Sequence, residues 1–328
     1  MPDVSINRRQ ILITAIESVY GTDRAPQEAN SYQAIRIIEP FQLDLGQDKL
    51  DQTGGLGTLG FSRPIGTVRP VGITFKTFLQ GLEGTSYTTV NKPPAGDLLR
   101  ACGLLETFVT SNAAGVPEYS YAPAGRVQSQ ASQNIIAHID GYDHRILGAM
   151  GNVNMLFVAA TPVVAEWNFR GLLSTEATTV RGQPVGLPSA TPQRWVGSGS
   201  VFVQSLNAVI ENLSFNTGNR VYEQKASIAL SGSGIFRVLI TERAPGGSYD
   251  PEATGVTSFD FINAWRSSSG AVLFAQAGVA QGNRLTLVCS QAINNALTRQ
   301  DKEGLAVFGI DWQAYERLGD DQFVIKFS

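Results

Sequence analysis

Apolar and polar residues alternate in short runs along most of this chain, and turn residues separate the runs. An alternation with a period of two is typical of β-strands that bury one face. The runs predict strands at residues 10–20, 34–45, 71–79, 134–139, 152–159, 163–173, 208–215, 236–241, 304–314 and 322–327. Hairpins are also predicted, one turning at 140–142 and one joining 271–275 to 284–289 around 282–283. The pattern therefore predicts a mainly β fold.

Two short segments have helical spacing instead. In DLLRACGL (97–104) apolar residues recur at three- and four-residue intervals, and Gly103 marks the last turn. The segment SFDFINAWR (258–266) predicts a second short helix with a capping residue before it. The Gly-rich stretch 46–66 has little apolar periodicity, which predicts either a mobile loop or an extended hairpin without a core of its own.

One sixteen-residue pattern occurs twice. Residues 37–52 and 209–224 both open with an apolar pair followed by Glu, alternate, turn at Gly46 or Gly218, and end in Gln. The same order of elements follows each copy. In this comparison 236–241 matches the strand at Val71, the two helices match each other, the two hairpins match each other, and 304–314 matches 163–173. This order favours a duplicated domain, and the alternative is one larger β domain with a decorated C-terminus.

The duplication predicts a division of the chain. The expected parts are an N-terminal arm (1–33), a first β domain (34–175), a linker rich in Pro, Gly, Ser and Thr (176–204) and a second β domain (205–328). A length of 328 residues can hold one large domain or two of ordinary size.

Composition removes several classes of function. Charged residues make up 16% of the chain, against roughly 25% in a typical globular protein, and the net charge is -3 with no basic stripe. Tight specific binding of nucleic acid is therefore not expected. Cys102 and Cys289 lack CxxC spacing and predict buried thiols in a reducing compartment. No apolar run reaches the length of a membrane span, and no signal-peptide pattern opens the chain, so folding in a cytoplasm is expected.

Candidate catalytic and metal-binding motifs have simpler structural explanations. The pattern GxGxxG occurs at 55–60, but Arg63 and Pro64 follow where a dinucleotide site needs a helix, so a phosphate site is not predicted. His138 and His144 flank an Asp- and Gly-rich segment that could supply metal ligands, although a hairpin turn explains it better. Asp320 and Asp321 are predicted to form the turn before the last strand. We expect no enzyme activity, cofactor or metal.

The order of certain segments resembles the major tail tube proteins of long-tailed bacteriophages, in their longer form. These segments are the helix DLLRACGL (97–104), a Tyr/Pro-rich turn YSYAP (119–123), DGYDHRILGAMGNV (140–153), FRGLL (169–173), APGGSYDPEA (244–253), FINAWRS (261–267) and GDDQFVIKFS (319–328). The resemblance covers most of the chain from about Ala34, and its motifs are structural rather than catalytic.

The resemblance implies a β-sandwich or barrel with short flanking helices, and self-assembly into rings that stack into a hollow tube. It implies that strands of neighbouring subunits line the lumen as one continuous barrel and that DNA passes through without specific binding. Other partners would be the tape measure, terminator and baseplate proteins of the virion tail, which is assembled in the host cytoplasm. Two domains in one chain would give a trimeric ring with pseudo-sixfold symmetry.

The resemblance also supplies candidate contact residues. The Gly-rich stretch matches the position of the family's long inter-ring loop, so deletion of 56–62 is expected to leave soluble subunits that do not polymerise. The candidate loop residues are Gly54, Gly55, Leu56, Gly57, Leu59 and Phe61.

Two other functions remain as alternatives, and a hydrolase with an unrecognised site ranks behind them. One is a terminator, baseplate hub or other minor tail protein with the same fold, which would make single rings. The other is a carbohydrate-binding β-sandwich module that uses exposed aromatic residues such as Trp195 or Trp265.

Overall fold

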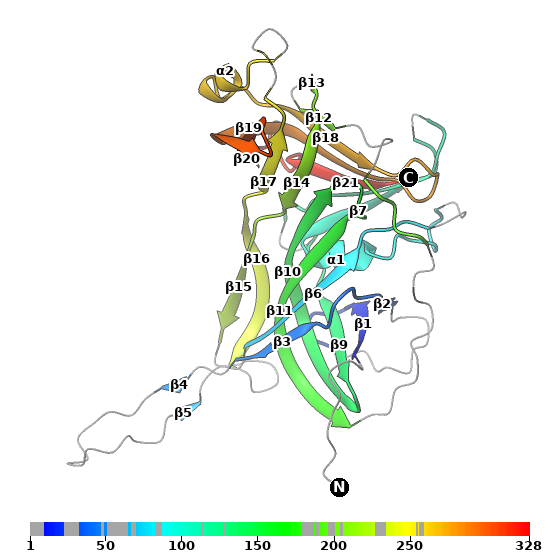
Figure 1. The fold of residues 1–328 in the computed structure, drawn as a ribbon. Helices are drawn as coiled ribbons and strands as arrows, with labels where there is room; N and C mark the ends of the chain where they lie inside the picture. Colours follow the sequence, from blue (N-terminus) through cyan, green and yellow to red (C-terminus); the bar gives the residue numbers. More distant parts are fainter. Residues whose placement is uncertain are drawn as a thin grey trace, which may run out of the picture.

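A computed structural model describes most of the chain (Figure 1). The described residues are 10–22, 33–46, 49–50, 65–66, 70–82, 87–112, 114–126, 129–178, 187, 190–195, 201–203, 206–226, 234–253, 255 and 259–328. Within them strands predominate and the two helices have six residues each, so the mainly β prediction is confirmed. None of the described helices is both long and apolar enough to cross a membrane.

Strands of the first half pair antiparallel in the order β2–β1–β9–β10–β11–β6–β3. The elements are β1 (Gln10–Ile16), β2 (Gln33–Ile35), β3 (Gln42–Leu45), β6 (Pro70–Phe78), α1 (Gly96–Ala101), β9 (Gln133–Ile139), β10 (Tyr142–Val158) and β11 (Val164–Thr178). β1 lies in the range expected to be an arm, yet it pairs along its whole length with β9.

Strands of the second half pair antiparallel in the order β13–β12–β18–β19–β20–β17–β14. The elements are β12 (Val201–Val203), β13 (Leu206–Asn207), β14 (Ile210–Asn216), β17 (Gly246–Pro251), α2 (Phe261–Arg266), β18 (Ala271–Ala277), β19 (Leu285–Lys302) and β20 (Leu305–Ala314). The two orders correspond strand for strand, and each helix lies in the chain between corresponding strands. β17 takes the place of β6, so the match of 236–241 to the strand at Val71 is wrong.

A hairpin is inserted at the same point of each half. β4 (Lys49–Leu50) and β5 (Ile65–Gly66) lie between β3 and β6, and β15 (Asn219–Lys225) and β16 (Ile235–Arg243) lie between β14 and β17. The described ends of the Gly-rich stretch are thus paired as a hairpin. The β15–β16 hairpin extends from the ends of β14 and β17 and lies alongside β10 and β11 (Figure 1), where Val238 and Ile240 pack on Met150.

Three more described strands have no counterpart among the described strands of the other half. They are β7 (Leu104–Val109), β8 (Glu118–Pro123) and β21 (Phe323–Phe327), and β21 pairs with both β8 and β19. The expected Tyr/Pro-rich turn at 119–123 is therefore wrong, because Tyr119 and Tyr121 alternate inward from a strand and are buried. The C-terminal strand thus joins a segment of the first half.

One hydrophobic core spans both halves. Its members come from the inward faces of strands on both sides of residue 200, and it includes the stacked rings of Phe75, Trp167 and Phe169. Trp195, within the expected linker, is only 6% exposed and its ring meets Phe157 edge-on at 5.8 Å. Part of the segment expected to be a linker is therefore packed against the body.

The partner strand of the hairpin that turns at 140–142 and the strand expected at 152–159, predicted as separate strands, form the single long strand β10. A register shift lies between Leu147 and Met150, and Gly148 has φ of 60° there. Such bulges bend a strand and let it change partners. Before the shift β10 pairs with β9, and beyond it with β14.

Candidate assembly interface

The histidine segment forms a turn. His138 Nδ1 lies 2.8 Å from Asp143 Oδ1 across the hairpin, and both side chains are buried. Asp140 and Gly141 have φ of 32° and 100°, which suits the two central residues of a tight hairpin turn. No group of three or more candidate metal ligands occurs among the described residues.

The carboxylates near the C-terminus also have a structural role. Asp321 accepts hydrogen bonds from the backbone N–H groups of Arg317 (2.8 Å) and Leu318 (3.2 Å). These bonds lower the pKa of the Asp321 carboxyl, because they favour its charged form. The arrangement holds the turn before β21, as the sequence predicts.

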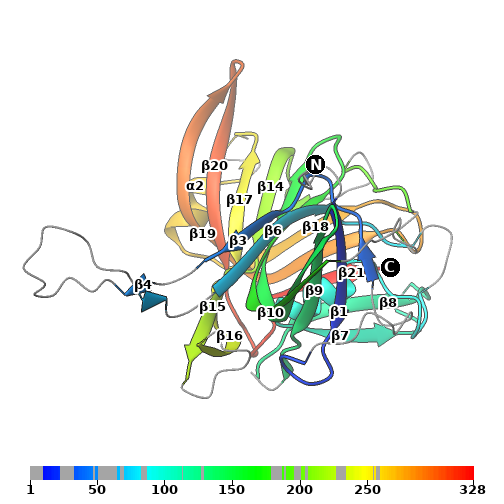
Figure 2. The ribbon, with the colours of Figure 1, turned by 90° about the horizontal axis from the view of Figure 1, so that it is seen from below.

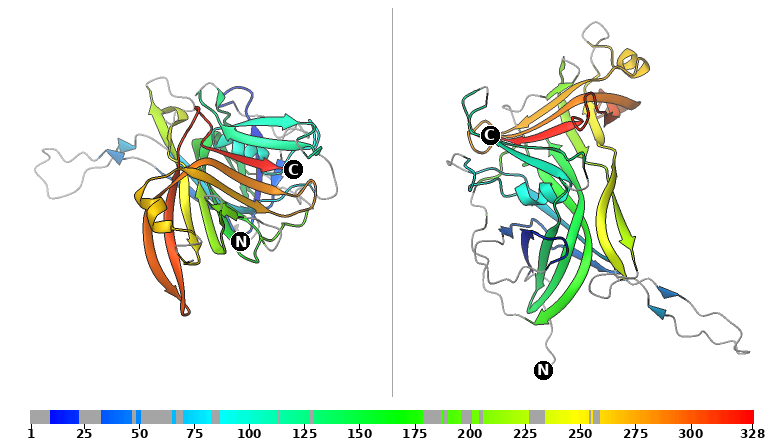
Figure 3. Two further views of the ribbon diagram at one scale, coloured as in Figure 1. Left: turned by 90° about the horizontal axis from the view of Figure 1, so that it is seen from above. Right: turned by 180° about the vertical axis from the view of Figure 1, so that it is seen from behind.

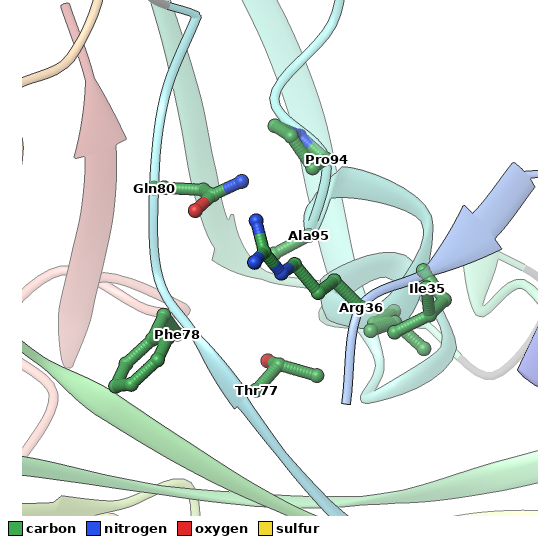
Figure 4. Close-up of a pocket in the computed structure, with 8 residues that line it drawn as sticks. Ile35, Arg36, Thr77, Phe78, Gln80, Pro94 and Ala95 are labelled. Atoms are coloured by element: carbon green, nitrogen blue, oxygen red, sulfur yellow. The ribbon is translucent and has the colours of Figure 1, made fainter. Parts of the chain in front are cut away.

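Figure 4 shows a small cavity between β2, β6 and the start of α1. The Arg36 guanidinium points toward the Gln80 amide, and Ile35, Thr77 and Ala95 line the rest. The cavity volume is about 20 Å³, room for little more than a water molecule. The cavity is too small for an organic substrate.

The thiols and loop residues give no chemical site either. Cys102 and Cys289 are free and fully buried, and burial raises the pKa of both thiols. The predicted inter-ring residues Gly54, Gly55, Leu56, Gly57, Leu59 and Phe61 lie outside the described residues. The GxGxxG pattern lies outside them as well.

Eight strands, four from each half, form a continuous sheet. The registers give the order β3–β6–β11–β10–β14–β17–β20–β19, and the two halves meet where β10 pairs with β14. We call this β10–β14 junction the internal seam. It pairs Asn154 with Asn216 and Met155 with Phe215.

The sheet has one apolar face and one polar face. The apolar side chains enter the common core. On the other face most side chains are half-buried or exposed, but Met150 and Leu172 are buried beneath the β15–β16 hairpin and Val307 is buried as well. The described charged side chains of this face are five acids and three bases. They are Asp44, Lys76, Glu166, Arg170, Glu211, Asp250, Lys302 and Asp311.

Hydrogen bonds between side chains connect the strands across the polar face. Asn152 Nδ2 donates to Asn216 Oδ1 at 2.8 Å, and the Ser214 and Ser248 hydroxyls are 2.9 Å apart. Asp250 accepts from the backbone N–H and the side-chain amide of Asn212, at 2.6 and 2.7 Å, and from Lys302 at 3.1 Å. Burial alone would raise the pKa of Asp250, but these bonds hold it below its ordinary value.

Both end strands of the eight-stranded sheet have an edge with no described partner. β3 pairs only with β6 among the described strands, and its Leu45 is 49% exposed. Beyond Ala292, β19 pairs only with β20 within the described part of the chain, and 298–301 are exposed. Figures 2 and 3 show the end of the β19–β20 hairpin projecting from the body. Unpaired strand edges offer backbone donors and acceptors to another chain.

These edges were not among the predicted contact residues. A signal was available in the sequence, because TRQDK (298–302) places four polar or charged residues after a Thr within a strand pattern. Charged residues are a common feature of edge strands.

Comparison of the chain with protein-family models gives no match, and comparison with curated proteins gives none.

Proposed function

We propose that this protein is the structural subunit of a bacteriophage tail tube, and that it polymerises into stacked rings that conduct the genome into the host. The observation that supports this best is the eight-stranded sheet, whose two end strands each have an edge without a described partner. A sheet with open ends can close on itself through other copies of the chain, and closure removes the exposed edges.

The charge pattern of the polar face is compatible with a conduit. Facing the lumen, five acidic and three basic side chains would not hold DNA by ion pairing. The apolar face is already buried in the subunit core, so water reaches the sheet on its polar face, outside the part that the β15–β16 hairpin covers. The proposal therefore assigns the polar face to the lumen.

We further propose that the two halves are tandem copies of one tube domain, so that three chains make a ring with pseudo-sixfold symmetry. The matching pairing orders and the hairpins inserted at the same point support this. Each chain would then contribute eight strands to the wall of the lumen.

Negative-stain microscopy of the purified full-length protein tests the proposal. We expect stacked rings with six lobes in end-on averages and the mass of three chains per ring. Single unstacked rings would instead favour a terminator or hub protein, and a persistent monomer would contradict a tube role. Six chains per ring would contradict the trimer.

A further inference from the structure

We propose that the outer part of β19, beyond Ala292, pairs antiparallel with β3 of a second copy, with Thr298 opposite Asp44. The internal seam supplies the template, since β10 corresponds to β19 and β14 corresponds to β3 in the pairing orders. The inference deepens the proposed function and rests on it, because it names the contact that closes the ring.

The inserted hairpins fix how the two halves align. The Gly46 N–H donates to the Pro70 carbonyl at 3.1 Å where the first hairpin leaves its sheet. In the second half the Ala244 N–H bonds the Gly218 carbonyl at 3.0 Å at the same point. Aligning Gly46 with Gly218 also aligns the two sixteen-residue repeats in the sequence.

This alignment transfers the register of the internal seam. It sets Asp44 of β3 where Asn216 stands in β14. Following the pairs across the sheet sets Thr298 of β19 where Asn154 stands in β10. Because Asn154 pairs with Asn216, Thr298 of one copy pairs with Asp44 of the next. The neighbouring pair on the same face is Gln300 with Gln42.

The side chains of these pairs suit strand edges that are exposed to water before assembly. Thr298, Gln300, Gln42 and Asp44 are all exposed, and their pairs can form hydrogen bonds across the junction.

On the opposite face the internal seam has buried Met155 and Phe157, whereas β19 has exposed Arg299 and Asp301. Charges at these two positions hinder random pairing of the free edge.

Such a contact is heterologous, because β19 and β3 are different surfaces of the chain. A heterologous contact generates a closed ring or an open filament, according to the rotation that it imposes. A ring would join the eight-stranded sheets of its subunits into one wall.

Disulfide trapping tests the register. In the double variant Asp44→Cys/Thr298→Cys, cross-strand partners would have Cβ atoms roughly 4.5–5.5 Å apart, a spacing that small strand movements bring into disulfide range. We expect covalent dimers and trimers on non-reducing gels after mild oxidation. Cys102 and Cys289 are fully buried and should give no background. The matched control is Asp44→Cys/Arg299→Cys, whose thiols lie on opposite faces and should not link.

Two single variants test the polarity of the contact. Asp44→Cys and Thr298→Cys should each stay unlinked alone and should give a dimer when dissociated subunits are mixed and reassembled. Absence of cross-linked product from the double variant overturns the inference, whether the protein assembles or stays monomeric.

Microscopy of the same samples separates the two proposals. Stacked rings without the cross-link would leave the tube role standing and reject this junction. Cross-linked rings that never stack would support the junction and reject the tube role.

Discussion

At the scale of single residues, a few polar side chains on each face of the sheet connect neighbouring strands. On the polar face Asp250 of β17 binds the start of β14 and Lys302 of β19. In the core, Trp167 Nε1 donates to Thr77 Oγ1 at 2.8 Å, and both side chains are buried.

Replacing Asp250 should make the protein less stable and less sensitive to acid. Asp250→Asn loses charge-assisted hydrogen bonds, which typically contribute about 1.5–3 kcal/mol, and partial exposure of the site favours the lower end. The folded-state pKa of Asp250 lies below its ordinary 3.8, so its contribution is present above about pH 4 and is lost as the pH falls through the folded-state pKa.

Urea unfolding from pH 7 down to pH 3 measures this effect. The wild-type advantage over Asp250→Asn should shrink below about pH 4. Asp311→Asn, an exposed carboxylate on the same face, is the control and should change stability little. A constant difference between wild type and Asp250→Asn at every pH would contradict the role of the carboxylate charge.

Thr77→Val should destabilise the protein by about 1–3 kcal/mol, because it leaves the Trp167 indole N–H buried without its partner. Thr77→Ser keeps the hydroxyl and should recover most of that loss. Chemical denaturation followed by tryptophan fluorescence measures both variants. Unchanged stability in Thr77→Val would contradict a contribution from this hydrogen bond.

At the scale of elements, β14 and β17 approach so closely that glycine is required. A Cβ at Gly247 would lie 1.9 Å from the backbone oxygen of Ser214. At Gly72 of β6, which corresponds to the neighbouring Gly246, the space is larger, since the nearest atom to a Cβ is Asp44 Cβ at 3.6 Å. The two halves of the sheet therefore differ in whether these positions tolerate a side chain, although their strand orders correspond.

Gly247→Ala should separate β14 from β17 and lower stability by about 1–3 kcal/mol or more, as overpacking does. Gly72→Ala should be tolerated, with a change below about 1 kcal/mol. Thermal unfolding of the two variants compares them directly. The opposite ranking would contradict the close approach between Gly247 and Ser214.

Sequence patterns predicted most strands but not where some of them begin or pair. Periodicity located β6, β11 and β20 because each alternates over a long run with a buried face. It divided β10 in two, because the glycines at 148 and 151 resemble breaks, although the strand continues through a bulge. It missed β8 as a strand because Tyr-Ser-Tyr-Ala-Pro reads as a turn, and its partner β21 lies some 200 positions away.

At the scale of the whole molecule, a sheet of eight strands joins the two halves through the internal seam. Phe215 lies at this seam, fully buried, with its ring 4.8 Å from that of Phe323 and 6.1 Å from that of Trp312. Leu43 is its counterpart at the open edge and is only half-buried. Sequence periodicity could not identify either edge, because it reports which face of a strand is buried and not which strand lies beside it.

Phe215→Ala should cost about 3–5 kcal/mol in the isolated subunit, as expected for a buried aromatic residue. Leu43→Ala should cost the subunit much less and should weaken assembly instead. Unfolding in dilute solution measures the first effect, and sedimentation at increasing concentration measures the second. A Leu43→Ala variant that assembles like wild type would argue against β3 as a contact edge.

The internal seam has a consequence for how a ring could form. Its two strands belong to one chain, so they meet at a local concentration set by the connecting residues and independent of how much protein is present. Only the junctions between chains depend on encounters in solution. In the proposed ring, half of the junctions would lie within single chains, with Met155 and Phe215 paired on their apolar face. The other half would form only when the charged outer edge of β19 meets a second copy.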